Sequence, residues 1–348
     1  MAGETRVREG RLREAVCGIF SALGVPESEE IADHLVLANL RGVDSHGVSR
    51  VGIYAKRLEL GLVSKQTRVE VVRETPVSAL VDGGNGSGIV VASRAMELAM
   101  EKAGESGIGA VCVRRSNHCG MLAAYTQRAM ERGLISLATT SAPAHMAPWG
   151  GSERFFGTNP LSYGVPAGEE IDIVFDMASS NVSRGKIILA AKNGHRIPLG
   201  WAIDSDGRET TDPEAALEGL VLPLGGAKGS GIAFLVEVLS SILSGANFGP
   251  HIPPLYDDFD SEQDVGHFFL AMRPDLFVPL EEFTTRMDYM IREVREAGVA
   301  EGHERIYLPG EIELERETER RREGIPLSPE VVRELEVISE RYKVSISL

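Results

Sequence analysis

Residues 41–50, with the sequence RGVDSHGVSR, contain the side chains best suited to chemistry. His46 lies between Ser45 and Gly47, directly after a strongly helical run, and Arg50 follows four residues later. Residues four apart share a helix face, so Arg50 can hold a carboxylate beside the histidine proton donor. A histidine that donates a proton beside an arginine that binds a carboxylate suits a substrate that is a 2-oxo or 2-hydroxy acid. In the alternative interpretation, His46 caps the helix and Arg50 is a surface charge.

Two glycine-rich stretches are similar to nucleotide-binding loops, but neither matches the known spacing. Residues 82–88 (DGGNGSG) lack the G-x-G-x-x-G order, and no acidic residue ends a strand about 20 residues later, which disfavours a Rossmann site. Residues 225–231 (GGAKGSG) lack the P-loop spacing. Their glycines nevertheless precede a helix, and Lys228 lies inside the turn, which favours an anion site. The alternative is a tight turn with Lys228 in solvent.

Metal and hydrolase chemistry are both disfavoured. The eight histidines include no pair four apart on a helix, the chain has no C-x-x-C, and no metal is predicted. His46, His118, His145 and Asp176 could converge in space, but their spacing gives no support for this. Ser45 and His46 lack a G-x-S-x-G elbow, and adjacent residues rarely form a nucleophile–base pair.

The composition is that of a globular enzyme. The 348 residues are 43% hydrophobic and 25% charged, which predicts two or three lobes around a shared core. No apolar run is long enough to span a bilayer and no signal peptide is expected, so no membrane partner is predicted. Three scattered cysteines (Cys17, Cys112 and Cys119) are consistent with a reducing cytoplasm. The net charge of −15 argues against nucleic acid and requires a local basic pocket for an anionic substrate.

Helices and strands alternate along the chain, which predicts an α/β fold. Helices are expected at 12–23, from Ser28 to about Leu40, and at 87–103, 121–132, 231–244 and 280–297. Strands are expected at 69–72, 79–81, 108–114 and 134–140. Residues 250–264 are expected to form a loop, within a segment (245–270) that can close over the site as a lid. The tail from Gly310 is charged and helical, so the two ends of the chain are expected to pack as one lobe.

Six ordered motifs together resemble the type 2 malate/L-lactate dehydrogenases. This family includes ureidoglycolate, sulfolactate and diketogulonate dehydrogenases and piperideine-carboxylate reductases. The motifs cover most of the chain: RGVDSHGVSR (41–50), SNHCG (116–120), WGGSERFFGTNPLSYGVPA (149–167), FDMASSNVSRGKI (175–187), TTDPEAALEGLVLPLGGAKGSG (210–231) and IYLPGE (306–311).

The resemblance implies a non-Rossmann α/β (α+β) fold with a mixed-sheet cofactor domain and a helical lobe formed by both termini. On this basis residues 1–75 are an N-terminal helical region that carries Ser45, His46 and Gly47, called here the SHG motif. Residues 76–310 form the central mixed α/β region with the NAD(P)-binding domain, and residues 311–348 are C-terminal helices that pack with the N-terminal lobe. A homodimer with its sites near the subunit interface is expected.

The resemblance also implies residue roles. His46, beside Ser45, is the expected acid/base; His118 is a second catalytic candidate, because its counterpart in ureidoglycolate-type relatives is credited with accepting the proton. A small carboxylate substrate is expected to bind Arg50, Tyr54 and Asn117. The expected cofactor-binding residues are Ser141, Asp176, Met177, Ala178, Arg184, Lys228, Gly229, Pro309, Gly310 and Glu311. Cys119 stands where relatives commonly carry an aromatic residue, so a different pocket wall is expected.

The function implied is an NAD(P)-dependent oxidoreductase that interconverts a small 2-hydroxy acid and its 2-oxo acid by hydride transfer. NAD is the expected cofactor and NADP the alternative. Arg184 is placed to contact the 2′-phosphate of NADP, but an arginine at this position also occurs in relatives that use NAD, so it does not decide between the two. Four other interpretations stay open: a cyclic-imine reductase of the piperideine-2-carboxylate type, a ureidoglycolate dehydrogenase, a binding protein without activity and a metal-dependent dehydrogenase.

Overall fold

The central element of the molecule is a mixed β-sheet. The computed structural model describes residues 5–192, 194–346 and 348, and within them seven strands run in the order β2-β3-β4-β10-β5-β6-β7. β3 and β4 are parallel, and the other neighbouring strands are antiparallel. The strands are β2 (Glu70–Thr75), β3 (Ser78–Asp82), β4 (Ile108–Ser116), β5 (Ile135–Thr140), β6 (Leu161–Val165), β7 (Ile173–Met177) and β10 (Val265–Met272). The predicted mixed sheet is therefore confirmed.

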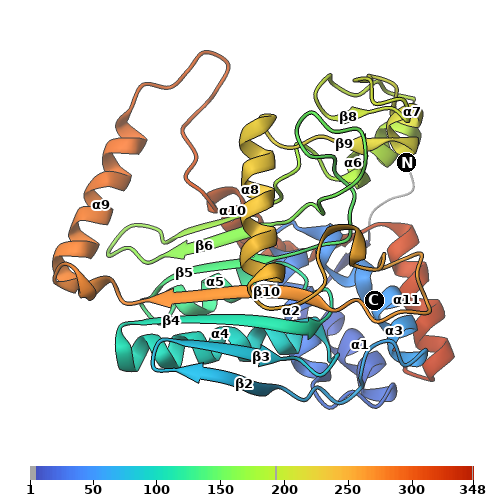
Figure 1. Ribbon diagram of the computed structural model, residues 1–348, viewed down its shortest axis with the longest axis horizontal. Coiled ribbons are helices and arrows are strands. Elements are labelled where there is room, and N and C mark those ends of the chain that lie inside the picture. The colour runs from blue at the N-terminus through green and yellow to red at the C-terminus, as the bar shows by residue number, and fades with distance from the viewer. Residues whose placement is uncertain (1–4, 193, 347) are drawn as a thin grey trace.

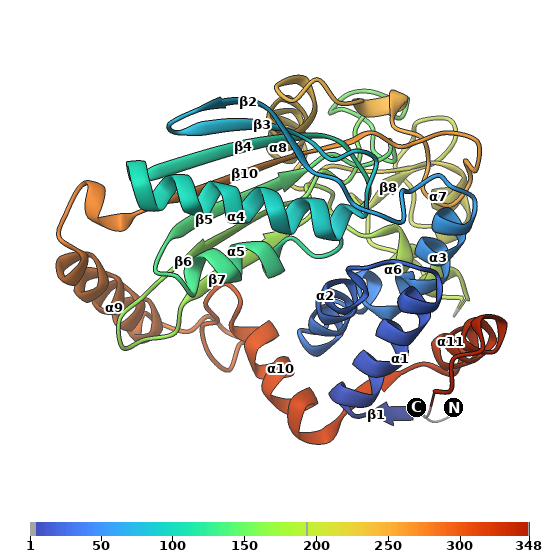
Figure 2. The same cartoon turned by 90° about the horizontal axis from the view of Figure 1, so that it is seen from below.

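Helices cover both faces of this sheet. α4 (Gly88–Ser106) and α5 (Ala123–Met130) pack on one face (Figure 2). α8 (Ala227–Glu237) and the π-helical turn that continues it (Val238–Ile242) lie on the other face (Figure 1). The approach of α4 is close, because a Cβ at Gly109 would lie 2.1 Å from the Ala99 carbonyl oxygen. Glycine on β4 therefore lets the helix reach the strands.

β10 occupies the middle of the sheet, between β4 and β5. Six of its eight residues are buried, so its sequence VGHFFLAM is a continuous apolar run without the alternation of a half-exposed strand. The sequence analysis expected the segment 245–270 to be a lid and assigned no strand to this stretch. The structure corrects this expectation, since residues 265–272 are core and only the residues before them form a loop.

The two ends of the chain build one helical lobe (Figure 2). β1 (Thr5–Val7) pairs antiparallel with β11 (Ile325–Leu327), and α1 (Glu9–Ala22), α2 (Ser28–Leu40), α3 (Val51–Glu59) and α11 (Pro329–Tyr342) surround them. One hydrophobic core joins them and includes Leu12 and Leu35 with Ile325 and Leu335 from the other end. The expected terminal lobe is confirmed, whereas the domain boundaries at residues 75 and 310 stay predictions.

Two further parts complete the molecule (Figure 1). A small lobe contains α6 (Arg184–Lys192), α7 (Pro213–Glu218), β8 (Ala202–Ile203) and β9 (Leu220–Val221), which the sequence analysis did not assign. α9 (Leu280–Glu296) projects from the sheet as an arm, and α10 (Glu311–Glu323) leads back to the terminal lobe. Among the helices of the described residues, none is both long and apolar enough to cross a membrane.

Asn39, at the end of α2, holds the loop that contains the SHG motif. Its side-chain Oδ1 accepts a hydrogen bond from the Val48 N–H (2.8 Å), and its Nδ2 donates to Asp44 Oδ1 (2.6 Å). Gly47 packs directly on Asn39, since a Cβ at this position would lie 2.1 Å from Asn39 Oδ1. From α10, the Arg320 guanidinium donates to both carboxylate oxygens of Asp44, at 2.7 and 3.1 Å. The C-terminal part of the chain thus braces the loop.

Two buried histidines tie the elements around the site together. His34 on α2 accepts a hydrogen bond from the Met121 N–H at its Nε2 (3.0 Å), and His267 on β10 lies between Thr140 Oγ1 (2.7 Å) and Ser116 Oγ (2.9 Å). Burial disfavours the charged ring and lowers the pKa of each histidine to about 3. Both rings are therefore neutral in the folded protein over the physiological range.

The contact between Gly47 and Asn39 predicts the effect of a single methyl group. In Gly47→Ala the new Cβ displaces the Asn39 side chain and its two hydrogen bonds, so the free energy of unfolding should fall by about 1–3 kcal/mol. The matched control is Gly104→Ala on α4, where a Cβ meets nothing within 4 Å and better helix propensity should raise stability slightly. Urea unfolding followed by circular dichroism measures both, and equal stability of the two variants would contradict the packing argument.

The buried histidines predict a loss of stability in mild acid. Below pH 6.5 the unfolded chain binds protons at these histidines, whereas the folded protein does so only near pH 3. Stability therefore falls as the pH falls, by about 1.4 kcal/mol per histidine by about pH 5.5. Urea unfolding at about pH 7.5, 6.5 and 5.5 measures this slope. A constant free energy of unfolding across this range would show that the rings are not held neutral.

Candidate active site

Ser45 and His46 lie on a short 3-10 helix (Asp44–His46) that follows α2. A second 3-10 turn (Val48–Arg50) leads directly into α3. Ser45 and His46 therefore lie on the loop between α2 and α3 and belong to neither α-helix. The Ser45 Oγ lies 3.0 Å from His46 Nδ1. Because Nδ1 is occupied by the serine, Nε2 is the ring nitrogen that remains for a substrate oxygen.

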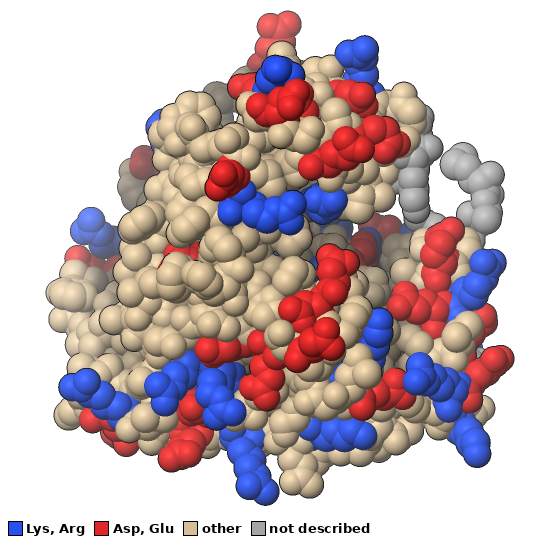
Figure 3. Space-filling view, turned by 45° about the vertical axis from the view of Figure 1, so that its right-hand side comes forward, with Lys and Arg blue, Asp and Glu red and all other residues tan. Residues whose placement is uncertain are grey.

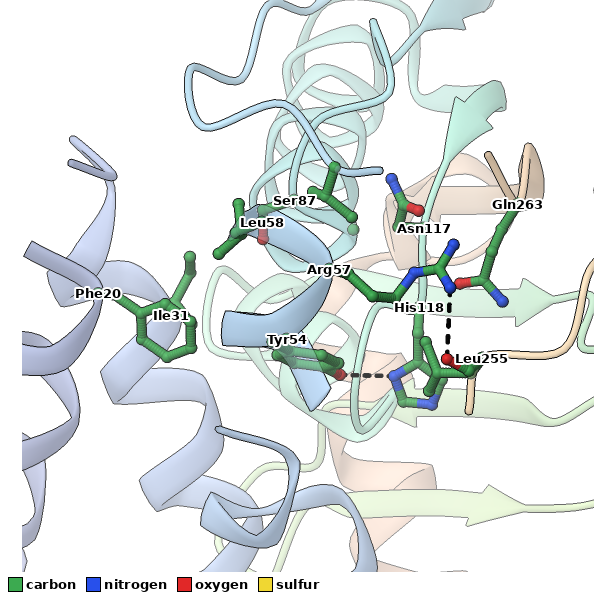
Figure 4. A pocket seen from close by; sticks show the side chains of 12 residues that line it. Phe20, Ile31, Tyr54, Arg57, Leu58, Ser87, Asn117, His118, Leu255 and Gln263 are labelled. Atoms are coloured by element: carbon green, nitrogen blue, oxygen red, sulfur yellow. Dashed lines mark hydrogen bonds between the residues drawn. The ribbon is translucent and has the colours of Figure 1, made fainter. Parts of the chain in front are cut away.

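His118, which follows β4, stacks on His46 although the two are far apart in the sequence. Their ring centroids are 5.5 Å apart with an interplanar angle of 22°. The Tyr54 hydroxyl lies 2.6 Å from His118 Nδ1 (Figure 4), and the Gly120 N–H donates to the same nitrogen at 3.2 Å. A backbone N–H can only donate, so Nδ1 is the acceptor and Nε2 carries the proton of the neutral ring. The structure therefore brings both predicted catalytic histidines together.

The surroundings keep both rings neutral. Burial, followed by the nearby Arg50 charge, lowers the pKa of His46 to about 4. Burial, Arg50 and His46 lower the pKa of His118 well below its ordinary value. Burial also raises the pKa of Tyr54, so its hydroxyl stays protonated and donates to His118. Near neutral pH both rings are therefore neutral, and a neutral imidazole with a free ring nitrogen can accept a proton.

Arg50 lies beside these rings and is oriented by two contacts. Its Nε donates to the Ser45 carbonyl oxygen at 2.7 Å, and its Nη1 donates to the Tyr256 hydroxyl. Its guanidinium carbon also lies 5.4 Å from the centroid of the Tyr256 ring. The predicted carboxylate-binding arginine is thus near the histidines, but the sequence analysis did not expect the tyrosine.

A pocket of about 370 Å³ opens beside His46. It joins segments that are distant in the sequence: the SHG loop, the start of α5, the end of β7 and the turn before α10. Its lining includes the predicted residues Ser45, His46, Asp176, Met177, Ala178, Pro309 and Gly310, together with Arg41, Val43, Met121, Leu122, Thr158, Val174 and Glu313. A second, much smaller pocket of about 30 Å³ is lined by Tyr54, Asn117 and His118, so the stacked rings stand between the two.

The 370 Å³ pocket combines apolar walls with polar groups, as a dinucleotide site does. Val43, Met121 and Leu122 offer apolar walls for a ring. Asp176 lines the pocket, and its Oδ2 accepts a hydrogen bond from the Ala123 N–H (2.7 Å). Desolvation of the carboxylate raises the pKa of Asp176 to about 6. Arg41 is almost fully buried and pairs with Glu317 (3.2 Å), yet its Nε has no partner within the described residues. An unpaired buried donor fits a polar ligand.

Five of the predicted cofactor residues lie outside the lining of this pocket. The Ser141 hydroxyl is buried against the Gly266 carbonyl oxygen (3.3 Å), and Arg184 donates to the Leu217 carbonyl oxygen (2.8 Å). Glu311 accepts a hydrogen bond from the Leu308 N–H, which shapes the turn before α10. Lys228 is exposed at the start of α8, in a turn that Gly229 closes by donating to Leu224. Their roles in cofactor binding stay predictions.

Two other sequence expectations have structural explanations. Asn117 is buried and donates to Asn85 Oδ1 and the Gly86 carbonyl oxygen (both 2.9 Å), so it holds the glycine-rich turn before α4. A Cβ at Gly88 would lie 2.1 Å from the Asn117 carbonyl oxygen, so this glycine serves packing. Cys119 was expected at the pocket wall, but it is 1% exposed and packs in the core beneath the sheet.

Sequence reasoning missed Arg41 and Tyr256. Arg41 begins the motif that the sequence analysis singled out, but only its burial against α10 distinguishes it from a surface arginine. Tyr256 lies in the expected loop at 250–264, where nothing in the local sequence indicates contact with Arg50.

The sequence and the fold were compared with those of known proteins. The family model "Malate/L-lactate dehydrogenase" matches residues 7–336. The L-sulfolactate dehydrogenase of Methanocaldococcus jannaschii is 37% identical over 96% of each chain, and the malate dehydrogenase of Pyrococcus abyssi is 38% identical over 97% of this chain and 95% of its own. The solved sulfolactate dehydrogenase structure from M. jannaschii has a TM-score of 0.93 at 35% identity, over 98% of both chains.

Relatives differ in the cofactor that their names give. The ureidoglycolate dehydrogenase of Escherichia coli O157:H7 is named for NAD(+) and is 32% identical over 86% of each chain. The (2R)-3-sulfolactate dehydrogenase of Chromohalobacter salexigens is named for NADP(+) and is 38% identical over 76% of this chain and 81% of its own. These names leave the choice between the two cofactors open. The sequence motifs, the fold and both kinds of comparison agree: the chain belongs to the malate/L-lactate dehydrogenase family of oxidoreductases.

Proposed function

We propose that this protein interconverts a small 2-hydroxy acid and its 2-oxo acid by hydride transfer, with NAD as the expected cofactor and NADP as the alternative. The observation that carries the proposal is the arrangement of His46 on His118, beside Arg50 and at the rim of the 370 Å³ pocket. This arrangement supplies a proton acceptor, a carboxylate partner and space for a dinucleotide within one region.

His46 is the proposed acid/base. In oxidation its Nε2 takes the substrate hydroxyl proton, and in reduction it returns a proton to the carbonyl oxygen. Arg50 binds the substrate carboxylate, and this negative charge offsets the arginine charge that helps to lower the pKa of His46. His118 is the proposed second catalytic group, and its Nε2–H can donate to the substrate oxygen. Bound NAD(P) supplies the hydride acceptor or donor, while the protein supplies orientation and charge.

The proposed cofactor site contains Asp176, Met177, Ala178, Pro309 and Gly310, which line the pocket. Arg41 is added to this set because its unpaired Nε and its position in the lining fit a polar group of the cofactor. Ser141, Arg184, Lys228, Gly229 and Glu311 are retained from the sequence analysis as residues whose part in binding awaits a ligand complex.

A homodimer is the proposed assembly. Figure 3 shows that a broad part of one face carries few charged side chains, although the chain has a net charge of −15. Phe234, Leu235 and Leu243 are more than half exposed on and just beyond α8, and Phe277 and Tyr289 are exposed on and beside the α9 arm. Exposed apolar side chains in such number favour association. The three free cysteines support the proposal of a reducing, cytoplasmic setting.

The test of the reaction is the absorbance of the reduced nicotinamide at about 340 nm. Purified protein with NADH or NADPH is offered oxaloacetate, pyruvate, sulfopyruvate, diketogulonate and a cyclic piperideine-carboxylate. Oxidation of the cofactor with a 2-oxo acid supports the proposal and names substrate and cofactor together. Turnover with the cyclic imine alone would instead support an imine reductase. This alternative has structural support, because a solved Δ1-piperideine-2-carboxylate reductase from Pseudomonas syringae pvar. tomato has a TM-score of 0.86 at 28% identity, over 96% of this chain and 99% of its own.

His46→Ala tests the acid/base. Removal of the ring should lower kcat by about 10²–10⁴-fold, because this is the usual contribution of a positioned general acid or base. Cofactor affinity, measured by fluorescence titration, should change little. The matched control is His303→Ala, which removes an exposed histidine between α9 and α10 and should leave both quantities unchanged. An active His46→Ala enzyme would exclude the assignment.

Arg50→Lys tests the carboxylate partner. Lysine keeps the charge but lacks the planar fork, so KM for the acid should rise about ten- to a hundredfold. The change also removes the hydrogen bond from Nε to the Ser45 carbonyl oxygen, so a smaller fall in kcat is expected. Steady-state kinetics at saturating cofactor separate the two effects. Kinetics equal to those of the wild type on a carboxylate substrate would show that Arg50 binds something else.

A further inference from the structure

The loop after the 3-10 helix Gly249–His251 is attached to α3 by Arg57. The Arg57 guanidinium donates to three backbone carbonyl oxygens of this loop: Leu255 (3.3 Å), Asp258 (2.7 Å) and Ser261 (3.0 Å). The bond to Leu255 is visible in Figure 4. Arg57 is only 1% exposed, and burial lowers the pKa of its guanidinium. A buried arginine whose partners are carbonyl groups of one loop holds the backbone of that loop in a defined shape.

A neighbouring residue of α3 makes a second attachment. The Lys56 ammonium lies 3.3 Å from the centroid of the Phe259 ring, which is a cation–π contact. The loop also closes on itself, because Asp258 Oδ1 accepts hydrogen bonds from the backbone N–H groups of Asp260 (3.0 Å) and Ser261 (2.9 Å). These contacts fix the part of the loop that carries Tyr256.

Tyr256 is thereby presented to Arg50. The tyrosine hydroxyl accepts a hydrogen bond from Arg50 Nη1, and the guanidinium carbon lies over the tyrosine ring, 5.4 Å from its centroid. Arg50 Nε is already bonded to the Ser45 carbonyl oxygen. The end of the guanidinium formed by Nη1 and Nη2 therefore remains for a carboxylate. Because the tyrosine oxygen accepts from Arg50, its own O–H proton is free to point to the same carboxylate.

We infer that Tyr256 is a substrate-binding residue that donates a hydrogen bond to the carboxylate held by Arg50, and that Arg57 positions it. The inference rests on the proposed function, since it requires a substrate with a carboxylate. Recognition by Arg50 and Tyr256 together selects a planar anionic group next to the reacting carbon. The loop that contains Tyr256 is thus part of the substrate site in its attached conformation.

Tyr256→Phe tests the hydrogen bond, since it removes one oxygen and keeps the ring against Arg50. KM for the 2-oxo acid should rise about ten- to a hundredfold, as expected for a hydrogen bond to a charged group. Because the bond is equally useful in the ground and transition states, kcat should stay within about threefold. The KM for the nicotinamide cofactor should not change. The inhibition constant of oxamate, a carboxylate that is not reduced, should rise in parallel with KM.

The matched control is Tyr342→Phe. This tyrosine lies on α11, where its hydroxyl interacts with Glu59 at the opposite end of α3 from Arg50. Its KM, kcat and oxamate inhibition should equal those of the wild type. An unchanged KM and oxamate constant in Tyr256→Phe, in an enzyme whose wild type reduces the acid, would overturn the inference. A wild type that reduces no acid would instead refute the proposed function, so the two failures are distinguishable.

Arg57→Lys tests the positioning role. One ammonium group cannot reach all three carbonyl oxygens, so the loop should be released while the charge is kept. We expect the same rise in KM as in Tyr256→Phe, with faster chymotrypsin cleavage after Tyr256 and Phe259. The double variant Arg57→Lys/Tyr256→Phe should have no higher KM than Tyr256→Phe alone, because both changes remove the same contact. Additive effects would show that Arg57 does not act through Tyr256.

Discussion

The hydrogen bonds of Asn39 are the constraint on which the rest of the site depends. One buried amide ends α2, accepts from the Val48 N–H and donates to Asp44, and so folds residues 44–50 into two short turns. This arrangement requires glycine at position 47, because any Cβ there would overlap the amide oxygen. It also sets the direction in which α3 starts. Arg50 immediately precedes this helix, and Tyr54 and Arg57 lie on it. A small displacement of Asn39 would therefore move the proposed acid/base, His46, and the proposed carboxylate partner, Arg50, together.

The chain uses its two ends to keep this loop in place. Arg320 reaches Asp44 from α10, and Glu317 on the same helix pairs with Arg41. The same helix begins after the turn of Pro309 and Gly310, which lines the same pocket as the SHG loop. The helical lobe built from both termini is therefore more than a support for the fold, because it connects the SHG loop to another part of the wall of the proposed cofactor site.

Exclusion of water decides the electrostatics of the site. The chain has a net charge of −15, yet the cation Arg50 acts on both stacked histidines, and Arg41 lines the same pocket as His46. Burial and the Arg50 charge keep His46 and His118 neutral. Desolvation raises the pKa of the Asp176 carboxyl to about 6. In the proposed reaction, a negatively charged substrate bound to Arg50 offsets the arginine charge that lowers the pKa of His46. The proposal therefore couples substrate binding to proton transfer.

The sequence by itself determined the local chemistry and the family. The SHG motif, the arginine four residues after its histidine and the ordered motifs predicted the residue types of the proposed reaction, and periodicity located long helices such as α2 and α4. It did not locate β10, because a strand buried on both faces is a continuous apolar run that lacks alternation. Nor could it place His118 on His46, Tyr256 on Arg50 or Arg41 in the pocket wall. Each of these contacts joins segments that are distant in the chain, and only the packing of the sheet, the terminal lobe and the loop brings them within bonding distance.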